Sequence, residues 1–187
     1  MAKVMVTGAT GILGRRLVSL LERSGHQVVG FKGDITDLNV VRTNIHKHSE
    51  TTHIFHLAAV VPTAEVDRNF AYALNVNAHG TGLLMAGLIE TGLKPWICYV
   101  SSSHVYAPSP APLREDFPCT SSSGYGLTKY LGEMSVSALA DRFDATVAIA
   151  RIFSYYDELQ AGSFLYPAWV EKLKRWDGKS DIEVFGG

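Results

Sequence analysis

Short apolar runs alternate along this chain with longer segments in which leucine, isoleucine and valine recur at helical spacing. The runs predict strands over residues 3–7, 27–31, 53–57, 96–100, 145–150 and 182–185, and the longer segments predict helices over residues 12–23, 38–46, 70–90, 125–143 and 166–176. Strands separated by helices need right-handed crossover connections, which make the strands parallel and cover both faces of the sheet. The pattern therefore predicts an α/β fold built on a doubly wound parallel sheet.

Composition narrows the class of protein. The chain has 187 residues, of which 47% are apolar and 19% charged, enough for one ordinary globular domain and too few for two. Its formal net charge of -1 gives no overall positive field that would attract nucleic acid or an anionic membrane surface. No apolar run approaches the roughly 20 residues of a membrane span, and no signal-peptide segment is evident. We therefore expect a cytoplasmic protein that binds neither nucleic acid nor membranes.

A glycine-rich segment joins the first predicted strand to the first predicted helix, and reads Thr7-Gly8-Ala9-Thr10-Gly11-Ile12-Leu13-Gly14. Gly8 permits a tight turn, Gly11 lets the backbone approach a pyrophosphate, and Gly14 lets the helix pack closely on the strand. The N–H groups at the start of the helix add a partial positive charge. We expect this segment to bind a dinucleotide; the alternative is a tight turn that binds nothing.

The end of the second predicted strand is where an acidic residue would hold the adenosine ribose of NAD. Lys32 lies there instead. It favours the additional phosphate of NADP, or it is a solvated loop lysine. Asp34 and Ile35 are candidates for the adenine end of the cofactor, although Asp34 could equally cap the next helix.

Tyr125 and Lys129 lie four residues apart, on one face of a predicted helix. A free tyrosine has a pKa of about 10. A nearby cation favours the phenolate and lowers that pKa, so Tyr125 is a candidate general acid/base. The same spacing also occurs by chance on solvated helices.

Three serines, Ser101, Ser102 and Ser103, end the fourth predicted strand at the carboxyl edge of the sheet, where open α/β folds bind ligands. A serine hydroxyl at this edge can hydrogen-bond a substrate alcohol or carbonyl. The alternative interpretation is an ordinary polar loop. A proline-rich stretch over residues 108–118 follows and predicts a long surface loop, a feature that is usually functional in a compact domain.

Five segments together resemble the extended short-chain dehydrogenase/reductase family, in particular its NAD-dependent epimerase/dehydratase group acting on nucleotide sugars. They are the glycine-rich segment, His56-Leu57-Ala58-Ala59, Asn77-Ala78-His79-Gly80-Thr81, Ser101-Ser102-Ser103-His104-Val105-Tyr106 and Tyr125-Gly126-Leu127-Thr128-Lys129. They span nearly the whole chain in the family's order. The resemblance implies a Rossmann-type sheet, bound NAD or NADP, and hydride transfer at a carbinol or keto carbon of a nucleotide sugar.

The resemblance also implies roles for individual residues. Tyr125 would be the acid/base, Lys129 would hold the nicotinamide ribose and tune Tyr125, and Ser102 would polarise the substrate oxygen. The remaining cofactor contacts it implies come from Leu57, Ala58, Ala59 and Asn77, in addition to the glycine-rich segment. A homodimer through a four-helix interface is the implied assembly.

One departure from the family pattern concerns the residues that follow Ser102. Dehydratases of this family typically carry an Asp-Glu pair there, whereas this chain has Ser103 and His104, which disfavours dehydration. Imidazole titrates near neutrality, so His104 is a candidate proton-transfer group in epimerisation. The alternative is a loop histidine without a catalytic role.

Other clusters point to no metal centre. The histidines at positions 46, 48, 53 and 56 have no carboxylate or cysteine partner at ligand spacing, and His56 is better interpreted as packing at a strand end. The two cysteines, Cys98 and Cys119, form neither a disulfide framework nor a Cys-x-x-Cys pair.

Two functional hypotheses follow. The first is an NAD(P)-dependent epimerase or reductase of a nucleotide sugar, and the second is a dinucleotide-binding sensor or regulatory protein without turnover. Because members of the resembled family continue past the last residues of this chain, we expect residues 1–160 to form the NAD(P)-binding domain with the catalytic residues. Residues 161–187 would then begin a truncated substrate-binding region.

Overall fold

The computed structural model describes residues 1–61, 63–160 and 164–182. The chain divides into two compact units, Met1–Phe153 and Ser154–Gly187. The predicted strand over residues 182–185 falls largely outside the described residues, as do parts of the predicted 161–187 region. The assignment of residues 1–160 and 161–187 to a cofactor domain and a substrate region therefore stays a prediction.

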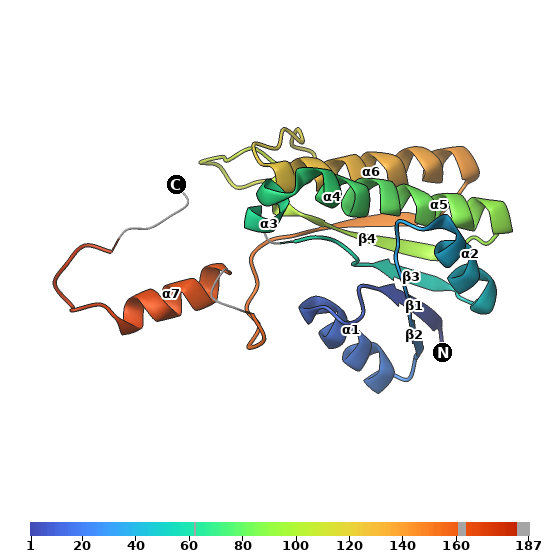
Figure 1. Cartoon of the computed structure of the whole chain (residues 1–187), viewed down its shortest axis with the longest axis horizontal. Coiled ribbons are helices and arrows are strands. Elements are labelled where there is room, and N and C mark those ends of the chain that lie inside the picture. Colours follow the sequence, from blue (N-terminus) through green and yellow to red (C-terminus); the bar gives the residue numbers. More distant parts are fainter. Residues whose placement is uncertain (62, 161–163, 183–187) are drawn as a thin grey trace. The chain divides into compact units, whose positions relative to one another are not determined.

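A five-stranded parallel sheet forms the centre of the first unit (Figure 1). Its strands are β1 (Lys3–Thr7), β2 (Gln27–Gly30), β3 (His53–His56), β4 (Trp96–Ser102) and β5 (Val147–Ile152), in the spatial order β2-β1-β3-β4-β5. The chain leaves β1 toward one edge and returns to form β3 on the other side of β1. Such a switch point opens a ligand crevice at the carboxyl ends of β1 and β3. The predicted α/β, Rossmann-type doubly wound sheet is confirmed.

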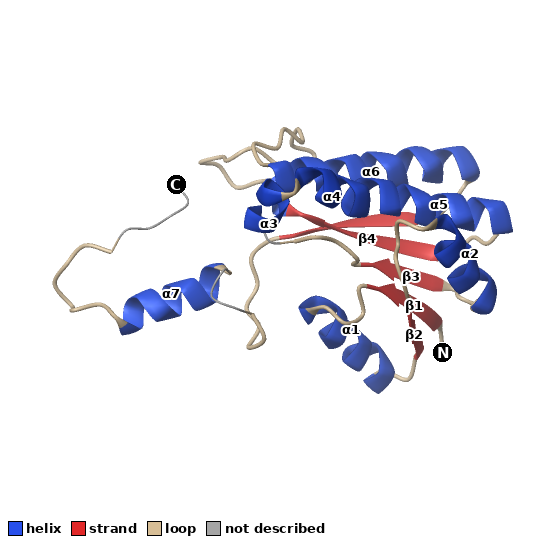
Figure 2. Cartoon of the chain, in the orientation of Figure 1, coloured by secondary structure: helices blue, strands red, loops and turns tan. Residues whose placement is uncertain are grey.

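Helices lie on both faces of this sheet (Figure 2). Within the first unit, α1 (Ile12–Arg23) lies on one face, and the opposite face carries α2 (Leu38–Lys47), α3 (Thr63–Arg68), α4 (Phe70–Leu74), α5 (Gly80–Thr91) and α6 (Gly124–Phe143). The main core lies between the second group and the sheet, and includes Met5, Ile54, Leu84, Ile97, Tyr99 and Val136. Burial of these side chains is the main force that holds the layers together.

Two features of the helical layer differ from the sequence prediction. The predicted helix over residues 70–90 is divided into α4, a π-helical turn η1 (Asn75–His79) and α5. A short helix, α3, precedes it in a region for which the sequence predicted no element. With only six residues, α3 is too short for an apolar periodicity, and packing of Val66, which is fully buried, holds it in place.

The second unit contains α7 (Leu165–Lys174), none of whose residues is buried. Near the start of this helix the rings of Tyr156 and Tyr166 are in contact, with their centroids 4.3 Å apart.

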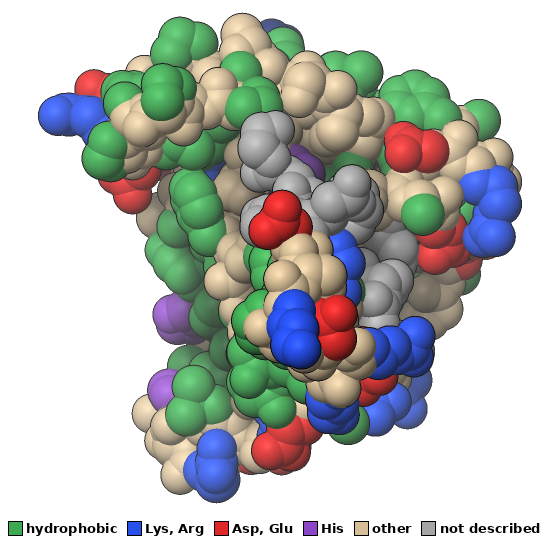
Figure 3. Space-filling view, turned by 90° about the vertical axis from the view of Figure 1, so that its left-hand side faces the viewer, with side chains coloured by type: hydrophobic (Ala, Val, Ile, Leu, Met, Phe, Trp, Pro, Cys, Tyr) green, Lys and Arg blue, Asp and Glu red, His purple; other side chains and the backbone are tan. Residues whose placement is uncertain are grey.

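No helix in the described parts of the chain combines the length and apolar character needed to cross a bilayer. On the face drawn in Figure 3, basic and acidic side chains are interspersed.

A very close contact fixes α6 against β4. The side chain of Tyr99 is fully buried, and its hydroxyl donates to the backbone oxygen of Lys129 over 3.1 Å. A Cβ atom added at Gly132 would lie 2.1 Å from the Tyr99 hydroxyl oxygen and 2.8 Å from its Cζ. Position 132 therefore admits glycine because the tyrosine ring occupies the space of a side chain.

This contact predicts opposite effects of the same substitution at two helical glycines. Gly132→Ala should lower the free energy of unfolding by about 1–3 kcal/mol, because the buried ring must move. Gly82→Ala, in α5 with nothing within 4 Å of the added Cβ, should raise it by about 1 kcal/mol through helix propensity. Urea denaturation of both variants measures the difference, and equal effects would contradict the packing described.

Candidate active site

The turn between β1 and α1 is packed backbone against backbone. Gly8 has φ of +67°, and a Cβ there would lie 2.8 Å from the amide nitrogen of Ala58. A Cβ at Gly14 would lie only 2.1 Å from the carbonyl oxygen of Gly8. These two positions require glycine, Gly8 for the turn and Gly14 for the approach of the helix.

Gly11 differs from these two glycines because it is exposed and begins the helix. It is the N-cap residue of α1, and no side chain caps that helix end. Thr10 is also exposed, while Ile12 and Leu13 are half-buried in the first turn. The turn thus presents uncapped backbone N–H groups at the carboxyl edge of the sheet, as a phosphate-binding turn must.

A buried histidine joins the two strands of the switch point. The hydroxyl oxygen of Thr7 accepts from the backbone N–H groups of Leu57 (3.1 Å) and Ala58 (3.0 Å), and lies 2.6 Å from Nδ1 of His56. With both lone pairs of Thr7 in use, its O–H must donate to His56 Nδ1. The hydroxyl of Thr81 donates to a backbone oxygen, so Thr81 must accept from His56 Nε2–H, at 2.9 Å.

This accounting makes His56 a neutral imidazole with its proton on Nε2. Complete burial, together with the positive charge of Lys129, lowers the pKa of His56 to about 3. Both ring nitrogens are therefore used inside the protein. Among the residues that the structure describes, no three His, Cys, Asp or Glu side chains gather as a metal site.

Asn77 lies in the π-helical turn and is fully buried. Its Oδ1 accepts from the backbone N–H of Val60 (2.7 Å), and its Nδ2 donates to the Val60 oxygen (3.0 Å) and the Thr128 hydroxyl (2.9 Å). Thr128 in turn donates to the backbone oxygen of Tyr125 over 2.8 Å. Asn77 thus ties the segment after β3, which includes Ala59, to the helix that carries Tyr125. A direct contact of Asn77 with a cofactor stays a prediction.

The segment after β2 is held by local hydrogen bonds. Lys32 is exposed, and its backbone N–H and C=O bond to the side chain of Asn44. Asp34 is exposed and accepts from the N–H and hydroxyl of Thr36, which lowers the pKa of Asp34. Ile35 is buried, and its Cγ2 lies 2.8 Å from the position that a Cβ at Gly80 would take.

The alternative in which Asp34 caps the following helix is wrong. Asp37 is the N-cap residue of α2, and its carboxylate accepts from the N–H groups of Asn39 and Val40. Asp34 instead closes its own turn with Thr36 because the chain makes one further turn before the helix begins. Its side chain faces solvent, beyond the end of β2, as the predicted cofactor role requires.

The structure brings Ser102, His104 and Tyr125 together at the carboxyl end of β4. Ser102 is the last residue of β4, and its hydroxyl accepts from the His104 N–H (3.2 Å) and lies 3.1 Å from His104 Nδ1. The imidazole meets the Tyr125 ring edge to face, with centroids 5.4 Å apart. The 3₁₀ turn η2 (Ser103–Val105) is pressed against α6, since a Cβ at Gly126 would lie 2.0 Å from the His104 oxygen.

Lys129 is buried one helical turn after Tyr125. Its ammonium nitrogen lies 4.3 Å from the centroid of the Tyr99 ring, a cation–π contact. Burial lowers the pKa of Lys129 to about 7, while the negative charge of Glu133 acts in the opposite direction. The ammonium therefore titrates close to physiological pH and is sensitive to the charges around it.

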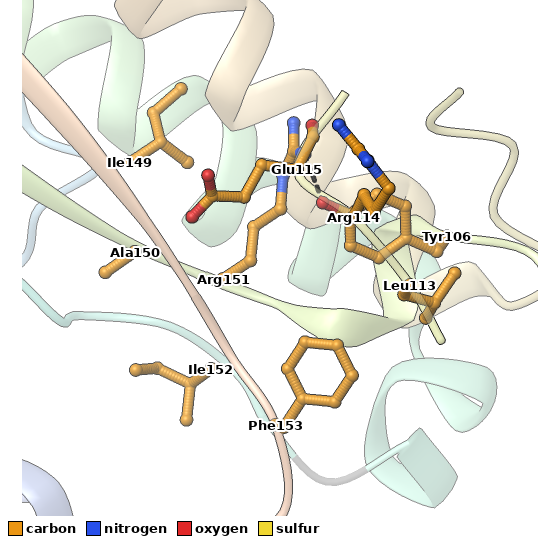
Figure 4. Close-up of a pocket in the computed structure, with 9 residues that line it drawn as sticks. All are labelled: Tyr106, Leu113, Arg114, Glu115, Ile149, Ala150, Arg151, Ile152 and Phe153. Carbon is orange, nitrogen blue, oxygen red and sulfur yellow. Dashed lines mark hydrogen bonds between the residues drawn. The ribbon is translucent and has the colours of Figure 1, made fainter. Parts of the chain in front are cut away.

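A cavity of about 500 Å³ lies beside β5 (Figure 4). It is lined by Tyr106, Leu113, Arg114, Glu115, Ile149, Ala150, Arg151, Ile152 and Phe153. None of the predicted site residues lines it. Arg151 joins Glu133, Tyr106 and the backbone of Glu115 in one network, which sequence reasoning missed because its members come from separate elements.

A family model described as NAD-dependent epimerase/dehydratase matches residues 4–187. The chain belongs to the NAD-dependent epimerase/dehydratase family. This confirms the resemblance drawn from the five sequence segments.

Members of the family with different activities are similar to this chain. A dTDP-4-dehydrorhamnose reductase from Streptomyces griseus is 35% identical over 136 residues, which cover 71% of this chain and 44% of that protein. A UDP-glucose 4-epimerase from Mycolicibacterium smegmatis is 28% identical over 166 residues, covering 76% and 52% respectively. The solved structure of MoeE5 in complex with UDP-glucose and NAD has a TM-score of 0.79 at 28% identity, covering 91% of this chain and 60% of that one. The chain spans about half the length of the curated relatives it matches.

The neutral state of His56 predicts how this family member responds to acid. With a pKa of about 3 when folded and about 6.5 when unfolded, His56 contributes stability that is complete above pH 6.5. The contribution is lost as the pH falls, by up to about 1.4 kcal/mol per pH unit. In His56→Gln, the decrease in unfolding free energy between pH 6.5 and 5 should therefore be smaller by about 2 kcal/mol.

The matched control is His46→Gln, at an exposed position of α2. It should keep the pH dependence of the parent chain, because it changes a side chain that is exposed and takes no part in the buried network. Urea denaturation at several pH values measures both variants. Parallel curves for His56→Gln and the parent would contradict a buried neutral imidazole.

Proposed function

We propose that this chain binds NAD or NADP at the β1–α1 turn and takes part in hydride transfer at a carbinol or keto carbon of a nucleotide sugar. The observation that carries the proposal is the convergence of Ser102, His104 and Tyr125 at the sheet edge that also carries the glycine turn. Buried Lys129 lies one helical turn below Tyr125 on α6. A proton-transfer group, its tuning cation and a phosphate-binding turn thus share one edge of the sheet.

The residues at the glycine turn fit a dinucleotide. The N-terminus of α1 carries no side-chain cap, and Gly11 leaves its backbone open to solvent, so a pyrophosphate can accept hydrogen bonds there. When bound, the nicotinamide supplies the hydride acceptor and donor. Lys32, exposed after β2 where an acidic residue would select NAD, is compatible with the additional phosphate of NADP.

Tyr125 carries the proton in this proposal. Its hydroxyl exchanges a proton with the sugar oxygen as that oxygen changes between alcohol and carbonyl. The hydroxyl of Ser102 hydrogen-bonds the same oxygen and orients it. The Lys129 ammonium favours the phenolate of Tyr125 and, as the family resemblance implies, bonds the nicotinamide ribose.

The relatives include both reductases and epimerases, and both reactions use these groups. His104 is the candidate second proton-transfer group that epimerisation beside a carbonyl would need, since its ring contacts both Ser102 and Tyr125. Dehydration is disfavoured because Ser103 and His104 replace the acidic pair that it needs. The substrate class proposed, a nucleotide sugar, follows the names of the relatives.

Assembly as a homodimer through a four-helix interface is part of this proposal. Large apolar side chains are exposed on the two helices concerned, namely Phe70 and Tyr72 on α4 and Leu127 and Met134 on α6. Exposed apolar side chains that gather on neighbouring helices are typical of protein interfaces.

Cofactor binding is tested by thermal unfolding with NAD⁺ or NADP⁺. We expect either nucleotide to raise Tm in proportion to the logarithm of its concentration above Kd. Gly11→Ala should remove most of this shift with little change in its own Tm, because the added methyl group meets only the Gly8 oxygen, at 3.3 Å. Gly82→Ala is the control and should keep the shift; no shift in the parent chain would contradict the proposal.

The role of Tyr125 is tested by exchange of hydride between the cofactor and a panel of UDP- and dTDP-sugars. Tyr125→Phe should lower kcat by about 10²–10⁴-fold and keep nucleotide binding. Tyr130→Phe, on the same helix, should keep the parent rate. Equal rates for the two variants would contradict the assignment of Tyr125, and nucleotide binding without any exchange would favour the regulatory alternative.

A further inference from the structure

A buried ion pair lies directly below the Tyr125–Lys129 dyad. Glu133 follows Lys129 by one helical turn on α6, and its side chain is 3% exposed. Its partner is Arg151 on β5, whose side chain is 20% exposed. Neither residue is part of the proposed proton transfer.

The geometry of this pair fixes the carboxylate firmly. Arg151 Nε donates to both oxygens of Glu133 (3.1 and 3.3 Å), and a second guanidinium nitrogen donates to Oε2 over 2.8 Å. The third nitrogen donates to the Tyr106 hydroxyl and to the Glu115 backbone oxygen, 2.9 Å away. Figure 4 shows the Arg151 side chain reaching toward Tyr106 and Glu115. The arginine is therefore anchored outside α6 as well, by Tyr106 directly after η2 and by the loop at Glu115.

Several ionisable groups surround Lys129. From α6 these are Tyr125 and Glu133, from β4 the ring of Tyr99, and from β3 the neutral imidazole of His56. Arg151 on β5 and His104 in η2 complete the set, Arg151 through Glu133 and His104 through its contact with Tyr125. Glu133 is the one carboxylate of this set, and thus the source of negative charge near the ammonium.

We propose that Glu133 is a positioning residue whose negative charge keeps Lys129 in its charged form, and that Arg151 holds the Glu133 carboxylate in place for this purpose. The inference rests on the proposed function and deepens it, because it assigns the control of the dyad to a second pair of residues. It concerns residues that touch neither the sugar nor the nicotinamide.

Two physical arguments support the assignment. A buried charge needs a paired and hydrogen-bonded partner, and the two-pronged arginine contact supplies one for Glu133. Burial already lowers the pKa of Lys129 to about 7, and the charge of Glu133 is what opposes the decrease. Without that charge Lys129 would be mostly neutral at pH 7 and would no longer favour the phenolate of Tyr125.

The test measures the titration of the Lys129 side chain directly, by NMR of lysine labelled at Cε and Nζ, in the full chain without nucleotide. Lys129→Arg assigns the signal. In Glu133→Gln, we expect the midpoint of the Lys129 titration to fall by roughly one pH unit. The matched control is Glu90→Gln, which removes the carboxylate of the exposed Arg42–Glu90 pair, whose bonds of 2.7 and 2.9 Å have the same two-pronged form. It should leave the midpoint unchanged.

Variants of Arg151 test the second half of the proposal. Arg151→Met should lower the Lys129 midpoint toward that of Glu133→Gln, because Glu133 then loses the charged partner that holds its carboxylate in the interior. Arg151→Lys keeps a cation beside Glu133 and should restore the midpoint at least in part. The double variant Glu133→Gln/Arg151→Met removes both charges and should stay folded, with the lowered midpoint of Glu133→Gln.

A parent midpoint in folded Glu133→Gln or in the double variant would overturn the proposal and leave the pair a purely structural role. A parent midpoint in Arg151→Met would overturn the part assigned to Arg151. Failure of the chain to bind NAD⁺ or NADP⁺ would contradict the proposed function without moving these midpoints, so the two failures are distinguishable.

Discussion

The structure depends most on the single buried imidazole at the switch point of the sheet. His56 accepts a hydrogen bond from Thr7 and donates one to Thr81, so β1, β3 and α5 meet at one ring. The Thr7 hydroxyl that bonds the ring also accepts the two backbone N–H groups that follow β3. The carboxyl ends of β1 and β3 are thus joined by a network of short polar side chains, and its hydrogen bonds require a neutral ring.

The same interior holds the ammonium of Lys129, and this proximity links two sets of residues that look separate along the chain. The positive charge of Lys129 disfavours a second positive charge at His56. A charged Lys129, which the dyad needs, therefore also helps to keep the imidazole at the switch point neutral. Glu133 and Arg151 lie on α6 and β5, whereas this histidine lies on β3. The interior thus contains a neutral network around His56 and an ionic network of Glu133 and Arg151. Lys129 interacts electrostatically with His56 and with Glu133.

Much of this arrangement could be predicted from local sequence. Strand and helix periodicity gave the parallel sheet, and Gly8 and Gly14 require glycine for the steric reasons that their spacing suggested. Short elements, and contacts between residues far apart in the sequence, could not be predicted. The π-helical turn has the sequence pattern of an ordinary helix, and the bonds that Asn77 makes within it reach Val60 and Thr128, 17 and 51 residues away. Glu133 and Arg151 are 18 residues apart, one on a helix and one on a strand. Hydrophobic periodicity does not predict which helix face meets which strand.

The π-helical turn has a consequence for how this chain tolerates changes in length. A π turn accommodates one more residue than an α turn, so removing one residue between Asn75 and His79 would leave a continuous α-helix rather than a broken one. Because the wider turn spreads about the same rotation over one more residue, α4 and α5 would keep nearly the same orientation relative to each other. Ala73 would stay in its cluster with Val60, Val66 and Tyr125, and the change would fall on the turn itself, where Asn77 bonds Val60 and Thr128. Homologous chains that keep the Asn77 network should therefore keep the residue count of this segment even where its letters diverge, so that alignment gaps accumulate in neighbouring loops instead.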